Sequence, residues 1–142
     1  MDASEVARLA RATLEGSMSF PEIVGSLISS GVEYYHVDPA TCSFTFYGAS
    51  GEAVVAPLPL NLRPIAETFN GAEFKAAILD SQRHGQKFQA FCERATRAGV
   101  QGYIAFLRGQ TVTYFGRQGD HHVEWFPGAR PRASGVIHAP IS

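Results

Sequence analysis

Two pairs of a histidine and a carboxylate in this sequence could bind a metal ion or transfer a proton. His36 and Asp38 occur in "EYYHVD", and His122 and Glu124 occur in "DHHVEW". Residues two apart on a β-strand point to the same face of the sheet, so each pair presents an imidazole and a carboxylate together. These groups are ligands of catalytic zinc and common general acids and bases. A metal-assisted hydrolase, or another enzyme built on these four residues, is therefore one hypothesis.

The alternative is that these polar side chains belong to the solvated face of an antiparallel sheet. The sequence contains no HExxH motif, no recognised zinc spacing and no GxSxG nucleophile motif. Its two cysteines, Cys42 and Cys92, are not spaced as CxxC, and we expect reduced thiols. We therefore favour a non-enzymatic protein, assign no catalytic or metal-binding residue and expect no cofactor.

The charge and composition are those of an ordinary globular protein. Twelve basic and thirteen acidic residues give a net charge of -1, without the positive field that nucleic-acid binding requires. Apolar residues make up 45% of the chain and charged residues 18%. The opening "MDASEVARLARATLEG" mixes charged with apolar residues, unlike a signal peptide or a membrane span. We expect one cytoplasmic domain over residues 1–142 that binds neither nucleic acid nor a membrane.

The sequence also repeats itself without a gap. The segment from Phe20 aligns with the segment from Phe88, an offset of 88 - 20 = 68 residues. Identities fall mainly on glycines and on alternating strand positions, where geometry restricts the choice of residue: Gly31 with Gly99, Tyr35 with Tyr103, Thr45 with Thr113, Gly48 with Gly116, Gly51 with Gly119 and Val55 with Val123. We infer an internal duplication, with pseudo-repeats at 3–56 and 71–126, a Pro-rich connector at 57–70 and an irregular C-terminal tail at 127–142.

Each repeat shows a helix, helix, strand, strand, strand pattern. Helical spacing of apolar residues occurs at 3–14 and 71–83, and second helices are expected at about 20–29 and 87–97. Strands are expected in "EYYHV", "CSFTFY" and more weakly "EAVVA" of the first repeat, and in "GYIAFL", "QTVTYF" and "DHHVEWF" of the second. The sequence therefore predicts an α+β fold, in which an antiparallel sheet of about six strands carries the helices on one face.

Pairing the predicted hairpins sorts the strand residues into two faces. Tyr35 opposite Phe46, and Tyr103 opposite Tyr114, give an apolar face for the helices. The other face, called the outer face here, is polar in the first repeat. Continuing the sheet across "GRQG" adds polar residues of the last strand to it. The candidate ligand-binding residues on the outer face are Tyr34, His36, Asp38, Thr45, Tyr47, His122 and Glu124.

The segments "GVEYYHVD", "GQKF" and "FCERATRAGVQGYIAFLRGQTVTYFGRQGDHHVEWFPG" resemble the YbcV-like family of small bacterial proteins of unknown function. Some members of that family are labelled phage envelope proteins. The resemblance extends from about Ser17 to Gly128. It implies a bacterial α+β protein with a single domain, and it carries over no activity, cofactor or catalytic residue.

The outer face of the second repeat would expose Ile104, Phe106 and Phe115. An exposed apolar patch of this kind usually marks a partner surface. We therefore expect the outer face either to bind a small molecule or to form a homodimer.

Overall fold

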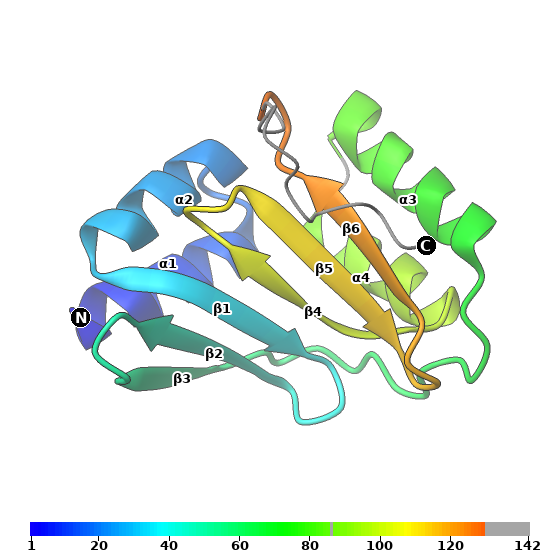
Figure 1. Ribbon diagram of the computed structural model, residues 1–142, viewed down its shortest axis with the longest axis horizontal. Helices are drawn as coiled ribbons and strands as arrows, with labels where there is room; N and C mark the ends of the chain where they lie inside the picture. Colours follow the sequence, from blue (N-terminus) through cyan, green and yellow to red (C-terminus); the bar gives the residue numbers. More distant parts are fainter. Residues whose placement is uncertain (86, 130–142) are drawn as a thin grey trace.

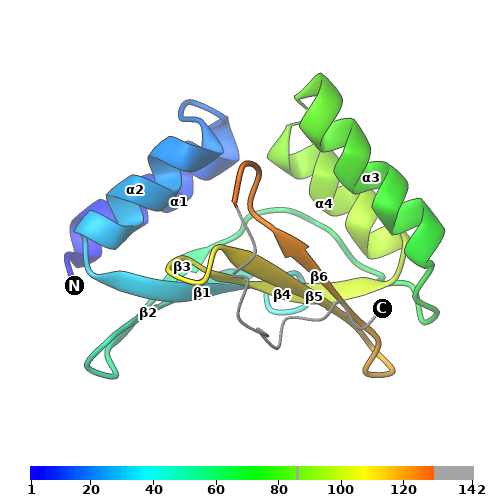
Figure 2. The same cartoon turned by 45° about the horizontal axis from the view of Figure 1, so that its top comes forward.

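Four helices pack on one face of a six-stranded antiparallel sheet within residues 1–85 and 87–129, the part of the chain that the computed structural model describes (Figures 1 and 2). The helices are α1 (Ala3–Glu15), α2 (Phe20–Ser29), α3 (Gly71–His84) and α4 (Phe88–Arg97). The strands are β1 (Val32–Asp38), β2 (Ser43–Gly48), β3 (Ala53–Pro57), β4 (Val100–Phe106), β5 (Thr111–Gly116) and β6 (His121–Trp125). The strand order is β3-β2-β1-β4-β5-β6, which confirms the predicted α+β class.

The order of elements repeats with the predicted offset. The five elements of the first half, α1, α2, β1, β2 and β3, begin 68 residues before α3, α4, β4, β5 and β6, as Phe20 and Phe88 illustrate (88 - 20 = 68). Strands β1 and β4 lie antiparallel at the centre, where His36 pairs with Ile104, its own equivalent in the second repeat. The two halves are therefore related by a pseudo-two-fold axis that passes between these two residues.

The helix pairs cover the two halves of the same sheet face. Figure 2 shows α1 and α2 above one half and α3 and α4 above the other. Each helix buries apolar residues against the sheet, among them Leu9 of α1 and Phe74 of α3, which are 0% and 1% exposed. The predicted pairs Tyr35 with Phe46 and Tyr103 with Tyr114 are confirmed, and they form the helix-covered face.

The connector between the repeats contributes to the core. Leu58 and Leu62 are buried in it. The backbone N–H of Ala66 donates to the carbonyl of Thr96, and that of Asn70 donates to the carbonyl of Ala98. These two hydrogen bonds hold the connector against the C-terminal end of α4. Most of the predicted C-terminal tail, residues 130–142, lies outside the described residues.

The last strand differs from the prediction by one residue of register. The backbone N–H of Gly116 donates to the carbonyl of Asp120 at 2.7 Å, so Asp120 belongs to the loop and Phe115 pairs with His121. The prediction closed the turn at "GRQG" and thereby placed Asp120 in the strand. A shift of one residue moves every side chain of a strand to the other face.

The prediction that His122 and Glu124 lie on the outer face is therefore wrong. His122 pairs with Tyr114, and Glu124 pairs with Val112, on the helix-covered face. The first repeat closes its last hairpin in the same way, with Gly48 donating to the carbonyl of Glu52 at 2.9 Å.

None of the helices in the described part of the chain combines the length and the apolar character needed to span a bilayer.

Candidate functional site

The outer face holds five of the seven predicted ligand-binding residues: Tyr34, His36, Asp38, Thr45 and Tyr47. Tyr34 stacks on Tyr47 with ring centroids 4.8 Å apart, and it lies 5.9 Å from Phe106 of the second repeat. The aromatic residues of the two repeats therefore meet at the centre of this face. All five residues are half-buried rather than fully exposed.

Asp38 holds the hairpin between β1 and β2. Its Oδ1 accepts hydrogen bonds from the backbone N–H of Ala40 at 3.0 Å and of Thr41 at 3.4 Å. It also accepts one from the Gln101 side chain at 3.2 Å. An aspartate that accepts from backbone groups two and three residues ahead is typical of a turn. The position of Asp38 is thus explained by folding.

His36 packs over a glycine of the neighbouring strand. Its ring centroid is 5.7 Å from that of Phe115. A Cβ atom on Gly102 would lie 3.2 Å from His36 Nε2 and 2.8 Å from the Val37 carbonyl, so the glycine makes room for the imidazole. The Nε2 atom is buried and has no hydrogen-bond partner among the described residues. His36 is held by packing, and the sheet separates it from the His122 and Glu124 pair.

His122 and Glu124 form a hydrogen-bonded pair on the helix-covered face. His122 is 5% exposed, its ring contacts Phe74 edge to face at 5.9 Å, and its Nε2 contacts Glu124 Oε2. An ionised carboxylate can only accept, so Nε2 is the donor. Because His36 and Asp38 point to the opposite face, the four residues of the hydrolase hypothesis do not converge. Within the described residues, no group of three or more His, Cys, Asp or Glu residues could hold a metal ion.

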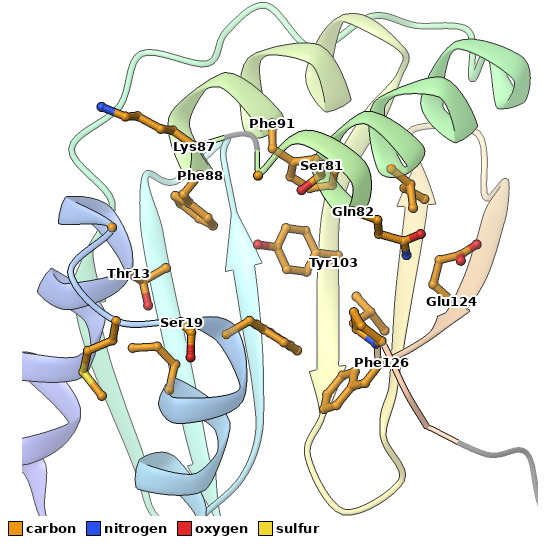
Figure 3. Close-up of a pocket in the computed structure, with 18 of the residues that line it drawn as sticks. Thr13, Ser19, Ser81, Gln82, Lys87, Phe88, Phe91, Tyr103, Glu124 and Phe126 are labelled. Carbon is orange, nitrogen blue, oxygen red and sulfur yellow. The ribbon is translucent and has the colours of Figure 1, made fainter.

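A cleft of about 800 Å³ lies on the helix-covered face, between the helix pairs (Figure 3). That volume is in the range of small-ligand sites. Five pairs of repeat-equivalent residues line the cleft, which therefore lies on the pseudo-two-fold axis: Thr13 and Ser81, Ser19 and Lys87, Phe20 and Phe88, Ile23 and Phe91, and Tyr35 and Tyr103. The sequence alone predicts this face only as the core beneath the helices.

Three tyrosines, Tyr35, Tyr103 and Tyr114, line the floor of the cleft. They are 7%, 9% and 9% exposed. None of their hydroxyls forms a hydrogen bond with another residue in the described ranges, which leaves them to water or a ligand in the cleft. Burial raises the pKa of all three, so they stay protonated and can donate a hydrogen bond. A phenylalanine would serve packing equally well, and the tyrosine repeated at 35 and 103 was the signal in the sequence for this floor.

The helix-covered face of the last two strands is more polar in the second repeat than in the first. Tyr114, His122 and Glu124 occupy the positions that Phe46, Val54 and Ala56 hold in the first repeat. Glu124 and Tyr114 are diagonal neighbours on adjacent strands, and the Glu124 carboxylate lines the cleft. The second repeat therefore contributes a carboxylate to the cleft that the first repeat has no counterpart for.

Cys92 of α4, which packs on the same sheet face as the cleft, is buried in the core and 3% exposed. Burial raises the pKa of its thiol to about 12, with Glu93 acting in the same direction. A thiol that stays protonated is a poor nucleophile, so Cys92 has the properties of a core residue.

Comparison with known proteins places the chain in a family. No curated protein matches it. A family described as "Protein of unknown function (DUF1398)" matches residues 11–124, which include all six strands up to Glu124 of β6 and all the helices except the start of α1. The chain belongs to this family, the DUF1398 proteins of unknown function.

Proposed function

We propose that this protein is a non-enzymatic binding domain that holds a small, mainly apolar ligand in the cleft between its helix pairs. The observation that carries the proposal is the floor of three largely buried tyrosines whose hydroxyls open into the cleft and have no hydrogen-bond partner among the described residues. These hydroxyls are not fully enclosed, so water in the cleft can bond to them in the free protein, and a ligand that replaces this water has to offer a polar group in its place. Ligand sites typically combine apolar walls with a few polar groups of this kind. The walls here include Phe88, Phe91 and Ile23.

Binding is favoured over catalysis because the tyrosines of the floor and the nearby Cys92 stay protonated. Burial raises the pKa of Tyr35, Tyr103, Tyr114 and Cys92, so at neutral pH each is a weak base and a weak nucleophile. Neutral phenols are instead good hydrogen-bond donors and acceptors for a neutral polar group on a ligand. We further propose a cytoplasmic location, on the composition of the N-terminal segment, and retain the narrower likeness to YbcV-like proteins as a hypothesis.

The proposal is tested by closing the cleft from α3. Ser81 lines the cleft, whereas Leu79 on the same helix is 46% exposed and does not line it (Figure 3). The probe is naphthylethanol, a neutral aromatic alcohol, and binding is measured by isothermal titration calorimetry. We expect saturable binding to the wild type and to Leu79→Trp, and at least about tenfold weaker binding to Ser81→Trp. Unchanged binding to Ser81→Trp, or no binding to the wild type, would contradict the proposal.

The outer face supports a second candidate, self-association of two copies. Val55, at the β2–β3 end of this face, is 68% exposed, and the Tyr34, Tyr47 and Phe106 cluster adds half-buried aromatic area. Light scattering after size exclusion measures the mass in solution. A dimer that Val55→Glu converts to a monomer would support this use of the face, and a monomeric wild type would rule it out.

A further inference from the structure

We infer that the ligand of the cleft carries an amine, and that Glu124 recognises its ammonium group. The inference rests on the proposed function and specifies the chemistry of the same cleft. It comes from comparing the two repeats, because the first repeat shows which residues the fold itself requires. At the positions of His122 and Glu124, the first repeat has Val54 and Ala56.

Folding alone does not account for the His122 and Glu124 pair. Val54 and Ala56 fill the equivalent sites with apolar side chains, and Ala56 is 3% exposed. Placing a carboxylate and an imidazole in such a site carries a desolvation cost, and apolar replacements of buried ionic groups are often neutral or stabilising. The Glu124 side chain keeps 30% of its surface exposed, and it lines the cleft. The pair therefore presents a carboxylate to the cleft at a cost to stability.

His122 fixes the direction of that carboxylate. Its Nε2 donates to one carboxylate oxygen of Glu124, and Phe74 packs edge to face against its ring. One oxygen of Glu124 is thereby occupied, and the other is left for a donor in the cleft. His122 is a positioning residue for Glu124, which would contact the ligand.

The charges around the cleft favour a cation. Among the described residues that line it, the charged ones are Glu15, Lys87 and Glu124. Figure 3 shows Lys87 at the far side from Glu124, with its ammonium directed away from the cleft. Glu124 thus supplies negative charge at its side of the cleft, and the one ammonium among these lining residues points outward. The aromatic rings of the floor and walls, including Tyr114 beside Glu124, add negative ring faces that attract a cation.

Three probes with the same aromatic body separate this inference from the proposed function. They are naphthylethylamine, naphthylethanol and naphthylacetate, which carry an ammonium, a hydroxyl and a carboxylate. We expect the amine to bind wild-type protein at least about tenfold more tightly than the alcohol, as a charged hydrogen bond in a half-buried site provides. The carboxylate should bind most weakly. Equal binding of amine and alcohol would overturn the role of Glu124 and leave the proposed function intact, whereas failure of all three to bind would overturn both.

Substitutions assign the preference to one carboxylate. Glu124→Gln should remove the advantage of the amine over naphthylethanol, and urea unfolding of the variant shows separately that it is folded. The matched control is Glu15→Gln, which removes the other carboxylate at the cleft and should keep the preference. A preference for the amine that survives Glu124→Gln, or is lost in Glu15→Gln, would overturn the assignment.

The double variant His122→Val/Glu124→Ala installs the residues of the first repeat. We expect it to unfold in urea at the same or a higher denaturant concentration than the wild type, and to bind amine and alcohol equally. If it loses stability strongly, or if it still prefers the amine, the pair serves the fold rather than the ligand.

Discussion

The tyrosines at 35 and 103 are the residues that distinguish this sheet face from an ordinary core. Each is more than nine-tenths buried, and each places a hydroxyl where no described residue accepts or donates a hydrogen bond. Sequence reasoning placed both correctly on the helix-covered face, because strand alternation decides the face. It could not show that the helices leave a cleft above them, since that depends on how two helix pairs meet.

Removing the Tyr103 hydroxyl tests whether this group contributes to the stability of the fold or to ligand binding. Because the Tyr103 hydroxyl has no partner in the described part of the free protein, Tyr103→Phe breaks no internal hydrogen bond. We expect the free energy of unfolding in urea to stay the same or rise by up to about 1 kcal/mol, and naphthylethanol affinity to fall about two- to tenfold. A variant that loses stability without losing affinity would show that the hydroxyl serves the fold.

The buried tyrosines and Cys92 also predict how stability depends on pH. An unfolded tyrosine ionises near pH 10 and an unfolded cysteine near pH 8.5. Burial raises both pKa values in the folded protein, to about 12 for Cys92. The unfolded chain therefore releases protons first, and the stabilisation present below about pH 9 is lost as the pH rises.

We expect the free energy of unfolding in urea to fall progressively between about pH 9 and about pH 12. The free energy of unfolding should fall less steeply in Tyr103→Phe, because this variant lacks one of the groups whose pKa burial raises. Stability that stays constant over this range would show that these groups ionise equally well in the folded state.

Asp38 and His36 show where residue types alone mislead. Their spacing matches an acid and base pair, yet Asp38 accepts from the turn that follows it, and His36 packs above Gly102. The polar groups that reach the cleft lie in the other repeat and on the other face.

At the scale of elements, one loop residue decided the composition of the candidate site. The strands, their faces and the helices followed from apolar periodicity, glycines and the duplication. The register of β6 did not, because "GRQGD" can close a hairpin with Asp120 either inside the strand or in the loop. The bond from Gly116 to the Asp120 carbonyl selects the second choice and turns His122 and Glu124 toward the helices. The first repeat contains the same loop at "GASGE", but the sequence does not show its hydrogen bonds.

The glycines that follow α2 and α4 offer a matched test of element packing. Gly31 and Gly99 are equivalent, and both have positive φ, +91° and +97°. A Cβ on Gly99 would collide with the carbonyl of Thr68 and lie 2.7 Å from Phe69 Cα, whereas one on Gly31 would meet Met1 Cα at 3.3 Å. The connector therefore approaches Gly99 more closely than the N-terminus approaches Gly31.

Both alanine variants should be destabilised, because the left-handed conformation costs a non-glycine residue about 1–2 kcal/mol. Gly99→Ala should lose about 2 kcal/mol more than Gly31→Ala, because backbone atoms of the connector must move. Urea unfolding of the two variants measures the difference. Equal losses would mean that the connector does not pack against Gly99 as described.

At the scale of the whole molecule, duplication explains both the fold and its asymmetry. Pairing of β1 with β4 about the axis at His36 and Ile104 joins two half-sheets into one, and brings two helix pairs over the same face. The sequence predicted the repeat and the single sheet, but it could not predict the order of the strands or the cleft that lies on the axis. The two repeats then differ at Glu124, which lines the cleft where the first repeat has Ala56.

Intermolecular nuclear Overhauser effects between naphthylethanol and the labelled protein test most directly which face of the sheet binds a ligand. We expect contacts from the naphthyl protons to Tyr103, Phe88 and Phe91, which line the cleft. Contacts to Tyr34, Thr45 and Tyr47 would instead place the site on the outer face. That result, or the absence of any specific contact, would contradict the assignment of the cleft as the binding site.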